Sequence, residues 1–223
     1  MTTLNQAPLF RLFRLMADKN HLDEFAQVGH HNLTTSIKTE LGTLAMYIAQ
    51  DSSDPSINYV VEVYRDEASY QTHVASEQFL AFASFAKDGL TDRVVYHLTP
   101  QLLLEKRAPL FSEKASSLSI RLAEVTVNPD NMAAFKAIVI QEMKDAMAKE
   151  AGVLVMYAGT LANQANVWRF VEIYQDEAAY ESHCETEHFK TYIAETAGMV
   201  ADKQLHLLKA SVLVNQGELE YEN

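Results

Sequence analysis

Two histidines, His183 and His188, lie in the segment EIYQDEAAYESHCETEHF at 172–189, which has the pattern of a helix after its first residues. An imidazole titrates near neutral pH and can act as a general base when a carboxylate sets its orientation and basicity. On a helix, Tyr180 and Glu187 lie about one turn from His183 and share its face. The segment therefore indicates either a catalytic base or a polar helix pair that closes the helix over a sheet.

The spacing of the two histidines bears on metal binding. His188 follows His183 by five residues, which corresponds to about 140° on a continuous helix. Ligands of one metal ion need to share a face, so no bound metal ion is predicted. Thr186 could instead cap a new helical segment and kink the helix.

A strand pattern precedes this helix, in NVWRFVEIY at 166–174. Its alternation places Trp168, Phe170, Glu172 and Tyr174 on one face. That face could line an apolar, aromatic pocket for a planar substrate, where burial would raise the pKa of Glu172. It could equally be the core between sheet and helix, with Glu172 satisfied by a helix terminus or a basic partner.

Much of the chain occurs twice. The segment EVYRDEASYQTHVASEQF at 62–79 matches 172–189, and Glu62 pairs with Glu172, 110 positions later. The same offset pairs residues along most of the chain: Phe25 with Phe135, Gly42 with Gly152, Tyr47 with Tyr157, His73 with His183 and Leu98 with Leu208. We interpret the sequence as a tandem duplication of one domain.

The two copies differ at several candidate site positions. Gln78 stands where the second copy has His188, and Asn58 stands where it has Trp168. These differences favour the second copy as the active one. Tyr47 and Tyr157 occur in both copies, where they could donate to a substrate oxygen or pack between the sheets.

Four segments are predicted along the chain. The first copy covers 9–105 and the second covers 118–214. The segment 106–117 between them is charged and contains serines and a proline, which is typical of a linker. The acidic tail, 215–223, is expected to be poorly ordered.

Each copy has the pattern strand, helix, strand, strand, helix, strand. This βαββαβ order is the ferredoxin-like arrangement, an antiparallel four-stranded sheet with helices on one face. The other face needs cover, and the sheets of two fused copies can cover each other. The predicted class is therefore α+β, with two tandem ferredoxin-like domains.

Composition excludes several classes of function. The chain has 223 residues and a formal net charge of -12, which disfavours nucleic acid and anionic membranes as partners. Cys184 is the only cysteine, so neither an intrachain disulfide nor a cysteine zinc cluster can form. The N-terminus does not have the pattern of a signal peptide, and no apolar run approaches the ~20 residues that span a bilayer. We therefore predict a cytoplasmic protein.

A glycine after the first helix, the strand ending VEIY, and the sequences DEAAYESH and EHFKTY resemble the antibiotic biosynthesis monooxygenase (ABM) superfamily of dimeric α+β barrels. The segment 171–195 is especially similar to the quinol monooxygenases and the autoinducer-2 degradation isomerase of that superfamily. The resemblance covers both copies. It implies that the two sheets pack as an α+β barrel and that His188 is a pocket residue.

This resemblance implies a monooxygenase that uses no cofactor and acts on a small quinol-like or hydroxy-carbonyl substrate. A keto-enol isomerase and a non-catalytic binding or stress-response protein are the alternatives. The expected catalytic residues are His183, His188 and Tyr157. The expected substrate-binding residues are Trp168, Phe170, Glu172, Tyr174, His73 and Tyr47. The copies would form a pseudo-dimer within one chain, or pair with a second chain in a homodimer.

Overall fold

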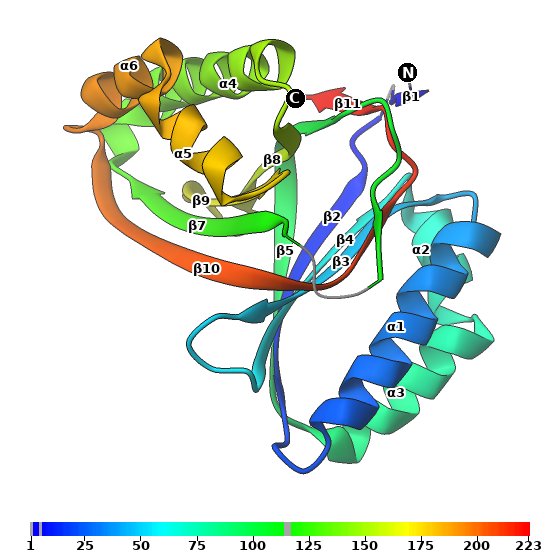
Figure 1. Cartoon of the computed structure of the whole chain (residues 1–223). Helices are drawn as coiled ribbons and strands as arrows, with labels where there is room; N and C mark the ends of the chain where they lie inside the picture. The colour runs from blue at the N-terminus through cyan, green and yellow to red at the C-terminus, as the bar shows by residue number, and fades with distance from the viewer. Residues whose placement is uncertain (1, 5, 114–116) are drawn as a thin grey trace.

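The computed structural model describes residues 2–4, 6–113 and 117–223. Both copies follow the predicted order of elements (Figure 1). In the first copy these are β2 (Leu9–Ala17), α1 (Leu22–Thr39), β3 (Thr43–Asp51), β4 (Ile57–Tyr64), α2 (Glu67–Val74), α3 (Glu77–Gly89) and β5 (Leu90–Glu105). In the second they are β7 (Ser119–Val127), α4 (Met132–Lys149), β8 (Val153–Leu161), β9 (Gln164–Tyr174), α5 (Glu177–Glu185), α6 (Glu187–Thr196) and β10 (Val200–Asn215), with a 3₁₀ turn at Pro129–Asn131.

The eight long strands close into one antiparallel barrel, so the predicted α+β barrel is confirmed. The strand order is β5-β2-β4-β3 in the first copy and β10-β7-β9-β8 in the second. Strand β3 pairs with β10, and β5 pairs with β8, which joins the two sheets at both edges. Strands β5 and β10 have 16 residues each, and each pairs first inside its own copy and then with the other copy.

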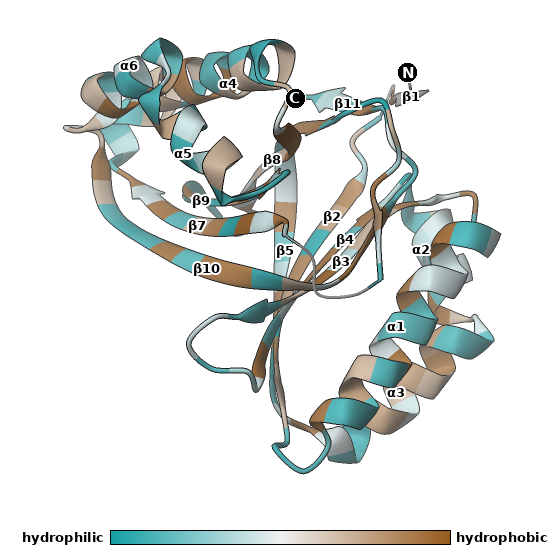
Figure 2. Ribbon diagram, in the orientation of Figure 1, coloured by the Kyte–Doolittle hydropathy of each residue, from teal (hydrophilic) through white to brown (hydrophobic). Residues whose placement is uncertain are grey.

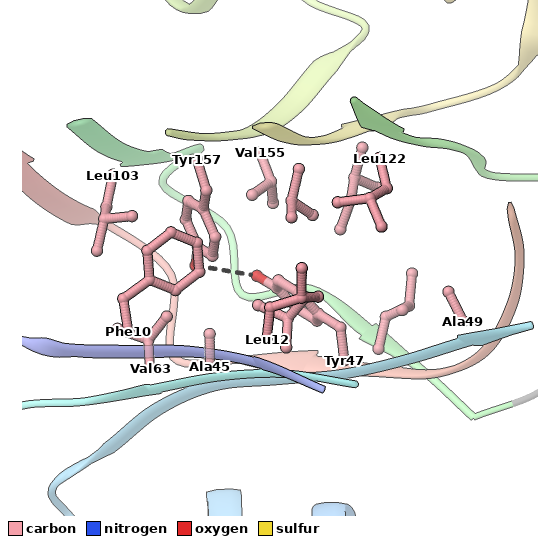
Figure 3. Close-up of a cluster of buried hydrophobic side chains, with 14 of the residues drawn as sticks. Phe10, Leu12, Ala45, Tyr47, Ala49, Val63, Leu103, Leu122, Val155 and Tyr157 are labelled. Carbon is pink, nitrogen blue, oxygen red and sulfur yellow. Dashed lines mark hydrogen bonds between the residues drawn. The ribbon is translucent and has the colours of Figure 1, made fainter. Parts of the chain in front are cut away.

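The barrel interior is a shared apolar core (Figure 3). Leu12 and Tyr47 of the first copy and Leu122 and Tyr157 of the second point into it. Helices α1 and α3 cover the outer face of the first sheet, and α4 and α6 cover that of the second (Figure 1). Apolar stretches follow the strands, whereas the helices mix apolar and hydrophilic residues (Figure 2). Alternate residues of each strand therefore point to opposite sides: one set packs in the barrel interior, and the other packs between the sheet and the helices.

The predicted second helix of each copy is broken in two. In the second copy, Thr186 ends α5 and begins α6: its backbone is extended, and its Oγ1 accepts a hydrogen bond from the Phe189 N–H. Ser76 caps α3 in the same way through the Phe79 N–H. The segment is therefore helical on both sides of a break, and the kink considered at Thr186 is present.

The tail also differs from the prediction. Instead of being poorly ordered, it forms β11 (Leu219–Glu222), which pairs with β5 and with the short strand β1 (Thr2–Thr3). Leu219 and Tyr221 are buried, and the apolar burial stabilises this edge. A further short strand, β6 (Phe111–Ser112), pairs with β10. No helix in the described ranges combines the length and apolar character needed to cross a membrane.

Candidate functional site

Each copy encloses a pocket between the outer face of its sheet and its helices. The pocket of the first copy has a volume of about 100 Å³, and that of the second about 50 Å³. Most of their lining positions coincide under the 110-residue offset, including Glu62 with Glu172, Tyr70 with Tyr180, Phe79 with Phe189 and Arg93 with Lys203. The duplication therefore produced two versions of one site.

The first pocket has one carboxylate among largely apolar walls. Glu62 is 8% exposed and accepts a hydrogen bond from the Tyr64 hydroxyl at 3.0 Å. Burial raises the pKa of the Glu62 carboxyl. Asn32, Tyr70 and Arg93 supply the other polar side chains of the lining. The pocket thus combines a basic carboxylate with hydrogen-bond donors and one cation.

Behind this pocket, His73 is fully buried and oriented by a carboxylate. Its Nδ1 lies 3.1 Å from Glu40 Oε2 and 3.2 Å from Ser36 Oγ, while its Nε2 contacts no hydrogen-bond partner among the described residues. Burial opposes ionisation of Glu40, but hydrogen bonds from His73 and Thr43 lower its pKa overall. A negative Glu40 favours the proton on Nδ1 and leaves Nε2 as an acceptor in the neutral imidazole.

The strand face predicted to line a pocket divides between pocket and core. Phe170 and Glu172 line the second pocket, and Tyr174 donates a hydrogen bond to Glu172 Oε2 at 2.8 Å. Trp168 stacks on Phe170 with ring centroids 5.5 Å apart and packs edge-on against Phe135. Trp168 is therefore a core residue that supports the pocket wall.

His183 and His188 come together because of the helix break. Their ring centroids are 6.1 Å apart. His183 Nδ1 lies 2.9 Å from Glu150 Oε1, and His188 Nε2 lies 2.7 Å from the same oxygen. The carboxylates that contact His183 belong to Glu150, at the end of α4, and Glu142, rather than to its helix neighbour Glu187.

Glu142 completes this group from α4. Its Oε1 lies 3.6 Å from His183 Nε2 and 4.0 Å from His188 Nε2. Burial, followed by repulsion from Glu172 and Glu150, raises the pKa of Glu142 to about 8. The group of Glu142, His183 and His188 is called the Glu142 cluster below.

Tyr47 and Tyr157 lie on the opposite face of the sheets, inside the barrel. Their hydroxyls are 3.2 Å apart (Figure 3), and both donate hydrogen bonds to Glu105. The void beside Tyr47 in the barrel measures about 10 Å³, which is too small for a substrate. The structure therefore separates Tyr157 from the histidines with which it was grouped, and Tyr47 from the pocket of its own copy.

The carboxylates of the first helix in each copy were not among the predicted site residues. Glu142 and Glu150 lie 41 and 33 positions before His183, so helical spacing around the histidine could not find them. One signal was present: Phe135, Val139, Glu142 and Ala146 recur at helical spacing and are all buried. A carboxylate on an otherwise apolar helix face needs a partner inside the fold.

Comparison with known proteins places the chain in a family. The sequence pattern of the antibiotic biosynthesis monooxygenase family matches residues 8–84 and 119–195, once in each copy. The chain belongs to the antibiotic biosynthesis monooxygenase family. The resemblance stated from the sequence is thereby confirmed. No protein of curated function matches the sequence.

Two solved structures share the tandem arrangement of this family member. A protein of Lactobacillus acidophilus, provisionally named a monooxygenase, has a TM-score of 0.91 and 29% identity over 97% of this chain and 100% of its own. A protein of Fusobacterium nucleatum, also provisionally named a monooxygenase, has a TM-score of 0.91 and 22% identity over 99% of this chain and 100% of its own. The second comparison supports the fold alone.

Proposed function

We propose that this protein is a monooxygenase that inserts one atom of dioxygen into a small, single-ring quinol bound in the pocket of the first copy. One observation carries the proposal: that pocket surrounds the buried carboxylate of Glu62 with apolar walls and has a volume of about 100 Å³. An apolar cavity of about 150 Å³ holds benzene, so modest side-chain movement admits one ring. Membership of a monooxygenase family supports the same reaction class.

The proposed active pocket lies in the first copy, whereas the sequence favoured the second copy as the active one. The second pocket, at about 50 Å³, is half as large, because Phe170 replaces Val60 and Tyr192 replaces Phe82 in its lining. It also holds two carboxyl groups, Glu172 and Glu142, and the charge of Glu172 raises the pKa of Glu142. In the first pocket Asn32 takes the place of Glu142, so Glu62 is the lining carboxylate on its own.

The reaction begins with proton removal. Glu62 accepts a phenolic proton from the quinol, and burial makes its carboxylate a stronger base than an exposed one. Arg93 stabilises the resulting oxyanion, and the amide of Asn32 and the hydroxyl of Tyr70 are placed to bond substrate oxygens. His73, held by Glu40, is a positioning residue: its ring packs against that of Tyr64, which donates the hydrogen bond to Glu62.

The substrate supplies the electrons. The quinolate transfers one electron to dioxygen, and the two radicals join at a ring carbon that carries hydrogen. The hydroperoxide then loses water, so this carbon becomes a carbonyl and the product is a hydroxyquinone. One oxygen atom enters the product, and the other leaves as water. The apolar walls exclude bulk water from the reactive intermediate.

Glu62→Gln is expected to lower the rate of dioxygen uptake by about 10²–10⁴-fold, because the glutamine can accept the Tyr64 hydrogen bond but cannot take a proton. Uptake should be measured with a panel of single-ring quinols, with ¹⁸O₂ to detect one labelled atom in the product. Glu67→Gln, the same change at an exposed carboxylate of the same copy, serves as the control.

The pH profile gives a second readout. Because burial raises the pKa of Glu62, the rate should increase with pH along a limb that lies above the usual glutamate value of about 4.3. Glu172→Gln tests the second pocket: collapse of uptake there, with Glu62→Gln active, would move the chemistry to the second copy. Substrate turnover without dioxygen uptake would contradict oxygenation and favour the isomerase.

A further inference from the structure

The second copy holds a group of metal-ligand atoms that the proposed reaction does not use. In the Glu142 cluster, one ligand atom each from Glu142, His183 and His188 lie within 4.8 Å of one another. We propose that these three residues bind one divalent transition-metal ion, with Zn²⁺ as the best match. His183 and His188 would point about 140° apart only on a continuous helix, and the break at Thr186 brings them together instead.

The first observation that supports a metal site is the burial of the Glu142 carboxylate with one oxygen that accepts no hydrogen bond from the described residues. Its side chain is 6% exposed, and its Oε1 accepts no hydrogen bond from the described part of the chain. Its repulsive neighbours include Glu172 and Glu150. A buried carboxylate without a hydrogen bond is costly, and a coordinated cation satisfies both its charge and its lone pair.

The distances between the ligand atoms can be compared with those of known metal geometries. Glu142 Oε1 lies 3.6 Å from His183 Nε2 and 4.0 Å from His188 Nε2. Bonds of about 2.0–2.1 Å at tetrahedral angles place two ligand atoms about 3.3 Å apart, whereas a facial octahedral set places them about 2.9 Å apart. The observed distances exceed both values and are closer to the tetrahedral one, so the side chains would move together slightly on binding. Two histidines and one glutamate around zinc also leave a fourth position open.

An outer carboxylate is already in place. His183 would bind the ion through Nε2, while its Nδ1 donates to Glu150 Oε1 at 2.9 Å. This carboxylate–histidine–metal arrangement fixes the ring and raises its basicity. His188 Nε2 also contacts Glu150 Oε1, at 2.7 Å, so binding exchanges that hydrogen bond for a coordinate bond.

A groove connects the cluster to solvent. It has a volume of about 700 Å³, and both Glu142 and His188 line it. Asp145, Glu187 and Glu195 line the same groove, together with one cation, Lys149, which forms an ion pair with Asp145 at 3.0 Å. Acidic walls raise the local concentration of cations, so the groove provides an entry path.

The first copy keeps one of the three ligands, His73, and lacks the other two. Asn32 and Gln78 occupy the positions of Glu142 and His188. Gln78 Nε2 donates to Glu40 Oε1 at 2.7 Å and to Ser36 Oγ at 3.2 Å, which closes a network of neutral donors around the carboxylate. The metal site is therefore specific to the second copy and does not depend on the oxygenase proposed for the first.

Zinc titration of untagged protein, by calorimetry with a competing chelator, tests the proposal. We expect one ion per chain, and Co²⁺ in its place should give the visible absorption of a tetrahedral site. His188→Gln and Glu142→Asn should each weaken binding by more than about 100-fold, because even an outer partner contributes 10- to 100-fold. Glu150→Gln should weaken it by about 10- to 100-fold. His206→Gln, which removes a histidine lying between Asp51 and Glu124, is the matched control.

A reciprocal variant keeps the test decisive if a loss variant misfolds. Asn32→Glu with Gln78→His places the missing ligands beside His73 in the first copy, and the expected result is two ions per chain. No stoichiometric zinc binding by the wild type, or unchanged affinity in folded His188→Gln and Glu142→Asn, would overturn the site. Neither outcome affects the Glu62 assay, which reads dioxygen uptake.

Discussion

Phe25→Ala in the first copy is expected to destabilise the whole chain, including the second copy, by about 3–5 kcal/mol. Phe25 is 4% exposed in α1, and its ring lies 6.1 Å from that of Phe82 and 6.2 Å from that of Phe85. Truncation to alanine leaves a cavity, because the neighbouring side chains of a close-packed interior move only partly into the space. The free energy of unfolding should fall for both copies together, because they build one barrel and are expected to unfold in a single transition.

The reason for shared unfolding lies in the seams of the barrel. Strand β5 of the first copy pairs with β8, and β10 of the second copy pairs with β3. Residues of both copies also fill the interior, where Phe10 meets Tyr157 edge-on at 5.8 Å. Unfolding one copy would expose two strand edges and half of this core, so neither copy is expected to remain folded alone.

Trp168 gives a direct measurement. It is the only tryptophan and lies in the second copy, so its fluorescence reports on that copy alone. In urea, fluorescence and far-UV circular dichroism should give one midpoint, and Phe25→Ala should shift both equally. Leu41→Ala, at a position 83% exposed, should change the stability by less than about 0.5 kcal/mol. A Trp168 midpoint that stays in place while a second transition appears would show two independent domains.

The sequence could predict the elements and the duplication, because strand alternation, helix spacing and a constant offset are local signals. It could not predict which edges join. Strands β5 and β10 each continue from their own sheet into the other, and no local pattern marks the crossing near Leu98 or Leu208. The pairing of the tail as β11 also depends on a partner strand more than 100 positions away.

The site shows the same limit. Helical spacing around His183 pointed to Glu187, whereas its carboxylate partners come from α4. The alternation of 166–174 correctly put Glu172 beside Phe170, but Tyr157 belongs to the neighbouring strand with the opposite phase and faces the barrel interior. A residue's face can be predicted within one strand, but the phase between two strands depends on register.

The barrel interior also carries a titratable group, Glu105, whose effect on stability is expected to be large. Glu105 is 8% exposed at the end of β5, and it accepts hydrogen bonds from Tyr47 of the first copy and Tyr157 of the second. The Leu219 N–H of the tail also donates to it, at 3.4 Å. Burial raises the pKa of Glu105 from 4.5 to about 7, although these hydrogen bonds oppose the increase.

The sign of the pH dependence follows from proton uptake. Between pH 4.5 and 7 the folded chain holds a proton on Glu105 that the unfolded chain has released. The contribution of this group is therefore complete below pH 4.5 and is lost as the pH rises through 7. The pKa difference corresponds to a loss of about 3 kcal/mol in the free energy of unfolding, as an order of magnitude.

Glu105→Gln should remove this loss, because the amide does not ionise. The wild type and the variant should be compared by urea denaturation from pH 4 to pH 9. The free energy of unfolding of the variant, relative to the wild type, should rise by about 3 kcal/mol over that range. Glu142 and other buried carboxyls also titrate, but they do so in both proteins, so the difference isolates Glu105. Any loss of the Leu219 contact is independent of pH and shifts the curve without changing its slope. A constant difference would mean that Glu105 is already ionised in the folded barrel, where the tyrosines of both copies would hold its charge at the seam.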